Sequence, residues 1–328
     1  MMAPRPSERG AALLSVLLMV AVLAVIAATT LDRIALSTKL SFNGNALAQA
    51  RMFNYAAESI AAARIEDLIA RDAAQTTLAG DWLGQEQILP IPVGTASATV
   101  RDGGNCFNLN SVVTEGEGGY QASPTGQEQF VALMVVLGVT EGLARPVAAA
   151  AADWADSDTV PLPSGAEDDA YRGSVQPYLP ANRPFVHPSE LRAVKGVNPA
   201  IYAKLRGWIC ALPEAVLSPL NVNTLSPEQA PLLVMLFPQK TLSPVSARAY
   251  LAKRPASGYG SLIRFWGAPE MAALEPSSLV QEQVQLTSKY FLLDTKVSLG
   301  ETTLEGEAMI VGTPAPARVI WRSWGERE

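Results

Sequence analysis

The densest group of side chains that could do chemistry is a set of carboxylates near the middle of the chain. Asp153-Trp154-Ala155-Asp156-Ser157-Asp158 is soon followed by Glu167-Asp168-Asp169. Calcium takes about six to eight oxygen ligands in flexible geometry, and a loop with spaced carboxylates can wrap around it. The stretch lacks the glycine and glutamate positions of an EF-hand, so a solvated acidic loop is the alternative. The candidate calcium ligands are Asp153, Asp156, Asp158, Glu167, Asp168 and Asp169.

No other group of residues has the composition of a catalytic site. The single histidine, His187, precedes Pro188, and no nucleophile, base and oxyanion donor are grouped in the sequence. We interpret His187 as a loop or helix-start residue. The chain is therefore not expected to be an enzyme, and a periplasmic hydrolase is disfavoured.

The two cysteines, Cys106 and Cys210, are far apart and lack metal-binding spacing. Two thiols are too few for a structural zinc site. A single pair in an exported protein is typical of one disulfide. We expect a bond between Cys106 and Cys210, with two buried thiols as the alternative.

The charge balance disfavours nucleic acid as a partner. The chain has 25 basic and 31 acidic residues, for a net charge of −6, whereas phosphate neutralisation needs clustered Lys and Arg. Residues 191–198 resemble the hairpin of a helix-hairpin-helix motif, and 221–254 resemble the helical fold of competence-type DNA receptors. Because the surroundings are acidic, we interpret both as packing architecture.

The N-terminus contains a long uncharged segment. No charged residue occurs from Ala11 to Leu31, and a short polar leader ending in Gly10 precedes it. As a helix with about 1.5 Å of rise per residue, the segment is about 30 Å long, the thickness of a hydrocarbon core. Three hypotheses fit: a secretory signal, a plain membrane anchor, and a pilin-like leader cut before the apolar run. The segment is longer than most signal h-regions, and no A-x-A site ends it.

After this segment the pattern predicts an amphipathic helix. Its apolar residues recur at spacings of three and four, with Glu58 on another face. Asn43-Gly44-Asn45 could interrupt the helix, because Gly costs about 1 kcal/mol relative to Ala. The apolar positions are Phe53, Ala57, Ile60, Ala61, Ile65 and Leu68.

The rest of the chain has a β–helical–β order. Strand patterns occupy 88–109 and return at 288–299, 302–311 and 318–324. Between them, residues 115–282 carry repeated helix-start signals in which a capping residue precedes proline. These starts are Asn198-Pro199, Ser226-Pro227 and Ser243-Pro244. A sheet interrupted by a large helical insertion fits this order.

Together these features resemble the K-type minor pseudopilins of type II secretion. The resemblance covers essentially the whole chain, and the order and spacing of its short motifs make it specific. The segments that carry it are Arg9-Gly10-Ala11, Phe107-Asn108-Leu109-Asn110, Asp153-Trp154-Ala155-Asp156-Ser157-Asp158, Gly165-Ala166-Glu167-Asp168, Ala181-Asn182-Arg183-Pro184-Phe185, Ser189-Glu190-Leu191-Arg192 and Leu220-Asn221-Val222-Asn223-Thr224.

The resemblance implies an α+β fold. A long transmembrane and amphipathic helix should pack on a pilin-like antiparallel sheet, with a large all-α insertion of helix-hairpin-helix or SAM-like type. It also implies calcium bound in the insertion. The expected domains are a prepilin-type leader at 1–10, a transmembrane helix at 11–31, the amphipathic helix and first strands at 32–114, the helical insertion at 115–282 and the C-terminal strands at 283–328.

The resemblance also implies processing at the N-terminus. A prepilin peptidase should cut between Gly10 and Ala11, and the new N-terminus should be methylated. Most pilins carry Glu at the fifth mature position, whereas K-type subunits lack it, and this chain has Ser15 there. The bulk of the chain should lie in the periplasm, with the leader in the cytoplasm and one helix crossing the inner membrane.

The implied function is structural. Such a subunit caps the tip of the secretion pseudopilus and begins its assembly, which supports export of folded proteins across the outer membrane. Its partners are the I-type and J-type minor pseudopilins, the pseudopilus, the prepilin peptidase and the inner-membrane secretion platform. The alternative is a membrane-anchored helix-hairpin-helix DNA receptor of the competence type, which needs a basic face.

Overall fold

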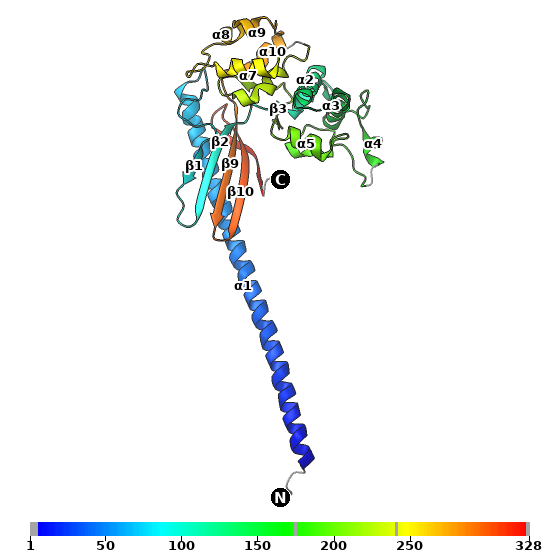
Figure 1. The fold of residues 1–328 in the computed structure, drawn as a ribbon, viewed down its shortest axis with the longest axis vertical. Helices are drawn as coiled ribbons and strands as arrows, with labels where there is room; N and C mark the ends of the chain where they lie inside the picture. Colours follow the sequence, from blue (N-terminus) through cyan, green and yellow to red (C-terminus); the bar gives the residue numbers. More distant parts are fainter. Residues whose placement is uncertain (1–5, 174–175, 240–241, 326–328) are drawn as a thin grey trace.

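In the computed structural model, one long helix carries a head made of a sheet and a helical body (Figure 1). The structure describes residues 6–173, 176–239 and 242–325. The helical body, residues 103–289, leaves the sheet after strand β2 (Thr95–Asp102) and returns at β9 (Tyr290–Leu299). Its upper part lies at the pole opposite the N-terminus (Figure 1).

The long helix α1 (Pro6–Arg71) is continuous over 66 residues. At about 1.5 Å per residue it extends about 100 Å. It runs through Asn43-Gly44-Asn45 without a break, and from Ala11 onward Ala46 is the first buried side chain. From Ala11 onward it contains an 18-residue window with a mean hydropathy of 2.9, none of it buried in the protein. In length and composition α1 fits a single membrane-spanning anchor.

The sheet is antiparallel, with strand order β1-β2-β9-β10-β11. The predicted C-terminal strands are confirmed, although the first begins two residues later than predicted. The first strand ends before Pro90, as expected because proline lacks the N–H that a ladder requires. The strands not yet bounded are β1 (Glu86–Leu89), β10 (Thr302–Val311) and β11 (Arg318–Trp324).

Small side chains let α1 lie close against one face of the sheet. Ala46 and Ala50 are buried in a cluster with Val297, and farther along Ala61 packs in a cluster with Phe291 and Leu293. An alanine stripe brings the helix backbone near the strands, and most of the larger buried side chains in this core come from the sheet, together with Ile65 of α1. The junction of α1 and the sheet is therefore a dry, closely packed core.

Two predictions about the faces of α1 are wrong. Ile60 is 43% exposed although its spacing placed it on the apolar face. Glu58 is buried, and its carboxylate accepts hydrogen bonds from Nε and Nη2 of Arg322 at 3.0 and 2.8 Å. The physical reason is that the contact stripe follows the alanines, and the edge strand β11 covers the flank that carries Glu58.

The helical body is not all-α as predicted. A hairpin, β4 (Val113–Gly116) with β5 (Gly119–Ala122), projects from it. Two parallel pairs of two-residue strands close it, β3 (Phe107–Asn108) with β6 (Ile209–Cys210) and β7 (Leu220–Asn221) with β8 (Val284–Gln285). These pairs are too short to show an alternating pattern in the sequence.

The helices of the body start where the sequence predicts. The side chains of Asn198 and Ser243 each accept a backbone N–H of the following first turn, and Gln229 accepts the N–H of Ser226 at 3.0 Å. The helices are α2 (Pro124–Val136), α3 (Glu141–Ala155), α4 (Asp168–Arg172), α5 (Pro199–Leu205), α6 (Ala230–Val234), α7 (Pro244–Ala252), α8 (Leu262–Trp266), α9 (Pro269–Ala272) and α10 (Ser278–Gln283), with 3₁₀ helices η1 (Leu109–Val112), η2 (Pro188–Ala193) and η3 (Pro227–Gln229).

Buried asparagines hold irregular segments of the body in place by hydrogen bonds to their backbone groups. Asn108 accepts the N–H of Leu212 at 3.0 Å and donates to two carbonyls of the same loop. The Asn110 amide bonds both the N–H and the C=O of Phe185, at 2.6 and 2.9 Å. These bonds satisfy backbone groups that have no helix or ladder partner. The conspicuous Phe107–Asn110 motif thus has a structural role.

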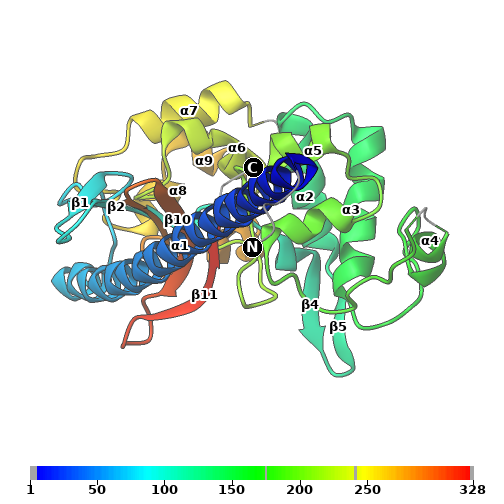
Figure 2. The same ribbon diagram turned by 90° about the horizontal axis from the view of Figure 1, so that it is seen from below.

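A second polar cluster and a disulfide attach the body to the sheet. The half-buried Asp102 carboxylate accepts hydroxyl hydrogen bonds from Thr224 and Ser288, both at 2.5 Å, and loss of solvent around it raises its pKa. The predicted bond between Cys106 and Cys210 is present, with Cα atoms 5.8 Å apart. Seen from below, the body extends sideways beyond α1 and the sheet, with α4 at its far edge from β1 (Figure 2).

Candidate metal site

Three carboxylates converge beyond the C-terminus of α3. Asp156 caps that helix, Asp158 lies in the loop after it, and Glu167 is the residue before α4. One oxygen from each of these residues lies within 4.8 Å of the other two. Segments about ten residues apart in the chain thus bring three carboxylates together. We call Asp156, Asp158 and Glu167 the acidic cluster.

Asp153 shapes the loop that carries the acidic cluster. It is fully buried, and its carboxylate accepts the backbone N–H groups of Ala166 at 2.6 Å and Leu162 at 3.1 Å. These bonds fold the loop back onto α3. Gly165 lies directly over this carboxylate, and a Cβ there would collide with it. Asp153 therefore positions the site but does not belong to the group of three.

The acidic cluster contains oxygens that the protein leaves unsatisfied. Among the described residues, Asp156 Oδ1 and both carboxylate oxygens of Glu167 are buried and accept no hydrogen bond. Burial, followed by the charge of Asp158, raises the pKa of Asp156 from 3.8 to about 7. Burial and then the charge of Asp156 raise the pKa of Glu167 from 4.5 to about 7. Such groups are costly when ionised unless a cation lies among them.

The donor set fits a hard divalent cation. All three side chains supply oxygen, which calcium and magnesium prefer. The irregular loop and the exposure of Asp158 leave room for carbonyl or water ligands, which favours calcium over the strict octahedron of magnesium. The residues present therefore fit a calcium ion held by Asp156, Asp158 and Glu167.

The other predicted ligands lie elsewhere. Asp168 accepts a hydrogen bond from Arg172 at 2.6 Å, and Asp169 is exposed at 3.7 Å from the same guanidinium. Sequence spacing also does not reveal the contact that holds the loop from outside. The Ser157 hydroxyl oxygen accepts the N–H of Tyr120 on β5, and the N–H of Ser157 donates to the carbonyl of Tyr120, both at 2.9 Å. No local sequence signal marks that contact, since the hairpin lies 37 residues away.

The remaining candidate residues have simpler surroundings. Gly10 and Ala11 lie inside α1, while residues 1–5 of the predicted leader lie outside the described residues. The Ser15 hydroxyl donates to the carbonyl of Ala11 at 2.6 Å, so it is satisfied within the helix. His187 is the N-cap of η2, which confirms its interpretation as a helix-start residue.

Comparison with known proteins identifies the family. Two family models described as type II secretion system (T2SS), protein K, match residues 105–214 and 220–287. The chain is 33% identical to type II secretion system protein K of Klebsiella pneumoniae over 322 residues, 97% of each chain. It is 36% identical to the protein of the same name from Aeromonas hydrophila over 258 residues, 77% of each chain.

A solved structure agrees with the sequence comparisons. A chain in the crystal structure of the GspK-GspI-GspJ complex from the type 2 secretion system of enterotoxigenic Escherichia coli superposes with a TM-score of 0.74. The identity is 28%, and the match covers 85% of this chain and 96% of that one. The present chain therefore belongs to the type II secretion system protein K family.

Proposed function

We propose that this chain is a structural minor pseudopilin that caps the tip of the type II secretion pseudopilus and begins its assembly. The observation that carries this proposal is the sideways extension of the helical body beyond α1 and the sheet (Figure 2). A thin helical fibre stacks its subunits one above another, and so broad a head hinders stacking above it. The proposed role of the finished fibre is to support export of folded proteins across the outer membrane.

Ser15 supports the same position in the fibre. A carboxylate in lipid is costly unless it is paired, and a Glu at the fifth mature position can pair with the N-terminal amine of the subunit ahead. The first subunit has no subunit ahead of it and does not need that pair. Ser15, whose hydroxyl bonds within α1, leaves the membrane at lower cost than an unpaired carboxylate.

The N-terminal segment is proposed to be a prepilin leader. In this proposal a prepilin peptidase removes residues 1–10, Ala11 becomes a methylated N-terminus, and residues 11–31 cross the inner membrane with the bulk of the chain in the periplasm. The family matches to residues 105–214 and 220–287 and the long apolar helix α1 support this assignment. The other domain bounds predicted from the sequence, 32–114, 115–282 and 283–328, stay a proposal, and the helical body described above is the wider segment 103–289.

We propose calcium as a structural cofactor of the helical body, held by the acidic cluster. The proposed partners are the I-type and J-type minor pseudopilins, together with the secretion platform of the inner membrane. Support for these two pseudopilins comes from the related chain in the GspK-GspI-GspJ complex. Family membership also favours secretion over the alternative of a DNA receptor.

Labelling of the fibre tests the cap. Immunogold or crosslinking directed at this chain should mark one end of each pseudopilus, because a broad head blocks further addition above it. A major pseudopilin carrying the same epitope is the matched control and should label the whole length. Label from this chain distributed along the fibre would contradict the cap.

Mass analysis of the purified protein tests the leader. The N-terminal peptide should begin at Ala11, since the peptidase cuts before the apolar run. It should also carry one added methyl group. In cells that lack the peptidase, the same chain should retain residues 1–10. A start after Ala27 or Ala28 would instead identify an ordinary secretory signal.

A further inference from the structure

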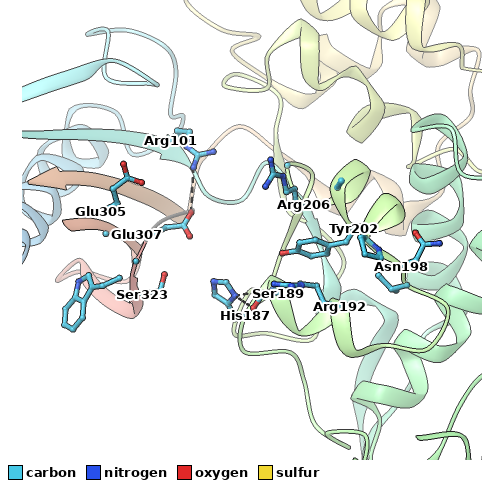
Figure 3. A pocket seen from close by; sticks show the side chains of 17 residues that line it. Arg101, His187, Ser189, Arg192, Asn198, Tyr202, Arg206, Glu305, Glu307 and Ser323 are labelled. Atoms are coloured by element: carbon cyan, nitrogen blue, oxygen red, sulfur yellow. Dashed lines mark hydrogen bonds and ion pairs between the residues drawn. The ribbon is translucent and has the colours of Figure 1, made fainter. Parts of the chain in front are cut away.

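Two hollows beside the helical body differ in how far the protein satisfies the groups that line them. The larger, of about 1000 Å³, separates the sheet from the segment around η2 and α5 (Figure 3). The charges of its sheet wall are paired: Arg101 lies 2.7 Å from Asp294 and 3.8 Å from Glu307, and Glu305 lies 2.9 Å from Lys296. The smaller, of about 500 Å³, lies at the base of the β4–β5 hairpin, and groups beside it lack partners.

The hairpin, which projects from the body (Figure 2), has one edge that the protein pairs and one that it does not. Gly116 and Gly119 flank its two-residue turn and form a hydrogen-bonded pair, so the next pair, Glu115 with Tyr120, points its backbone groups outward at the two edges. On the β5 edge, both backbone groups of Tyr120 bond to Ser157 at 2.9 Å. On the β4 edge, the N–H and C=O of Glu115 have no hydrogen-bond partner among the described residues. Strand β4 is therefore an open edge.

The smaller hollow, which we call the hairpin pocket, adjoins this open edge. Its lining includes Ser111, Val113, Thr114, Val216, Leu217 and Leu279. Val216 and Leu279 are 46% and 49% exposed, so the pocket presents apolar surface to solvent. Ser111 is 1% exposed, and its buried hydroxyl makes no hydrogen bond. A buried hydroxyl without a partner is unfavourable until a ligand bonds it. Edge and pocket thus offer backbone hydrogen bonds and an apolar contact side by side.

The charges around this surface are negative. Glu282 lines the hairpin pocket, and Glu115 and Glu117 lie exposed on the hairpin. In the part of the chain that the structure describes, these three carboxylates have no ion-pair partner, and the pocket lining contains no Lys or Arg. Opposite charges on neighbouring strands stabilise their pairing, whereas like charges oppose it. The surface therefore favours a basic strand and disfavours a second copy of β4, which would bring the same glutamates with it.

We propose that the open edge of β4 and the hairpin pocket bind an extended segment of a partner protein that alternates basic and apolar side chains. The segment adds a third strand to the hairpin, bonds the backbone of Glu115 and places an apolar side chain against Val216 and Leu279. Its basic side chains face Glu115 and Glu282, and its backbone reaches the Ser111 hydroxyl. In such strand addition, main-chain bonds supply affinity and alternate side chains supply specificity. The proposal does not depend on where in the fibre the chain lies.

Peptide binding to the full chain in a non-ionic detergent tests this surface. The probe is a fluorescein-labelled octapeptide that alternates lysine and valine, and its binding is followed by fluorescence anisotropy at low salt. We expect saturable binding. An octapeptide that alternates glutamate and valine should bind at least about 10-fold more weakly, because its charges oppose those of the surface. Equal binding of the two peptides, or no saturable binding of the first, would overturn the proposal.

A substitution at position 115 separates strand pairing from charge. Glu115→Pro removes the outward N–H but leaves in place the pairs within the hairpin, Thr114 with Gln121 and Gly116 with Gly119. It should weaken binding of the lysine–valine peptide by about 5-fold more than Glu115→Gln, which removes only the charge. Equal affinities of these two variants would indicate ionic attraction without strand addition and would count against the proposal.

A second substitution probes the hairpin pocket without changing the hairpin. Leu279→Lys places a charge where the apolar side chain of the peptide enters, at a position exposed enough for the fold to accept it. Binding of the lysine–valine peptide should weaken by at least about 5-fold, since an apolar contact is lost and a like charge is added. The matched control is Ile263→Lys on α8, where the side chain is 86% exposed, and it should bind as the unchanged chain does. Unchanged binding in both variants would refute the pocket.

Hydrogen exchange of the full chain shows where the peptide binds. The bound lysine–valine peptide should slow amide exchange in 113–117 by at least about 3-fold, because the Glu115 N–H becomes hydrogen-bonded. Exchange in 196–206, beside the larger hollow, should stay the same. Protection of 196–206 alone would place the peptide there and overturn the proposal. Dimers of the chain that form without peptide and are abolished by Glu115→Pro would assign the edge to a second copy, with the same consequence.

Discussion

The acidic cluster shows how surroundings assign different roles to the same side chain. Asp156 and Asp169 are both aspartates in one acidic stretch. The first has a buried oxygen without a hydrogen bond, whereas the second is exposed beside Arg172. Asp153 is also buried, yet backbone N–H groups satisfy its oxygens. Only Asp156, Asp158 and Glu167 therefore gain substantially from a bound cation.

Calcium should raise the melting temperature of the protein, and the effect should depend on the acidic cluster. A ligand that binds only the folded state stabilises it by about 2.7 kcal/mol at a hundred times its dissociation constant. Asp156→Asn should lose most of the calcium-dependent shift because it removes a ligand charge. Asp169→Asn is the matched control and should keep the shift. Melting curves unchanged by excess chelator would refute the site.

The same groups predict how this calcium effect depends on pH. Because the pKa values of Asp156 and Glu167 are raised to about 7, the folded metal-free protein binds more protons than the unfolded chain between about pH 4 and 7. Its free energy of unfolding should fall as pH rises through that window. Calcium binds the ionised groups, so its melting-temperature shift should grow with pH. An equal shift at about pH 5 and 7.5 would speak against these carboxylates as ligands.

The sequence contains enough information to locate this site but not to choose its ligands. The spacing of the aspartates marks the correct loop. It does not reveal that Leu162 and Ala166 turn their N–H groups onto Asp153, because that contact depends on how the loop closes. It also does not show that Asp168 turns toward Arg172. Ligand choice is set by tertiary folding, whereas the density of charge is local.

At the scale of elements, the disulfide joins β6 to the residue just before β3, far away in the sequence. Phe107 and Asn108 on β3 pair with Ile209 and Cys210 on β6, which brings Cys106 beside Cys210 across a separation of 104 residues. The surrounding cluster includes Tyr290 of the sheet. The bond thus lies where the helical body meets the sheet.

Reduction should destabilise the protein substantially. Closing a loop of about 100 residues is worth at most about 4–5 kcal/mol in the chain-entropy model. Chemical denaturation with and without reductant should show that loss, and a chain with Cys106→Ser and Cys210→Ser should be insensitive to reductant. Two reactive thiols in the denatured, unreduced protein would contradict the bond.

Elements can be predicted from the sequence where local signals decide, but not where packing decides. Caps such as Asn198 and the alternating strands at the C-terminus follow from local pattern. The sequence alone does not decide whether α1 continues through Gly44, because one glycine costs little in so long a helix. The burial of Glu58 against Arg322 does not follow, because the sequence does not show which strand covers that side of α1. The hairpin at 113–122 is too short to stand out.

At the scale of the whole molecule, the helical body is inserted into one connection, the one between strands β2 and β9. Asp102 at the end of β2 pairs with Phe291 near the start of β9, and Gly103 donates to the carbonyl of Tyr290 at 2.8 Å. The two ends of the body are therefore adjacent. A two-residue Asn-Gly turn could replace everything between Asp102 and Phe291, since such turns join antiparallel neighbours.

This topology allows the two proposed causes of capping to be separated. A chain with the body replaced by an Asn-Gly turn should remain a helix packed on a sheet, because the α1 core contains no residue of the body. With Ser15→Glu added, it has neither the broad head nor the missing carboxylate, and immunogold should find it along the fibre. The excised chain alone and Ser15→Glu alone are the controls, and each should label the interior less than the combined variant. If the combined variant, folded by circular dichroism, still marks only one end, neither bulk nor position five determines the cap.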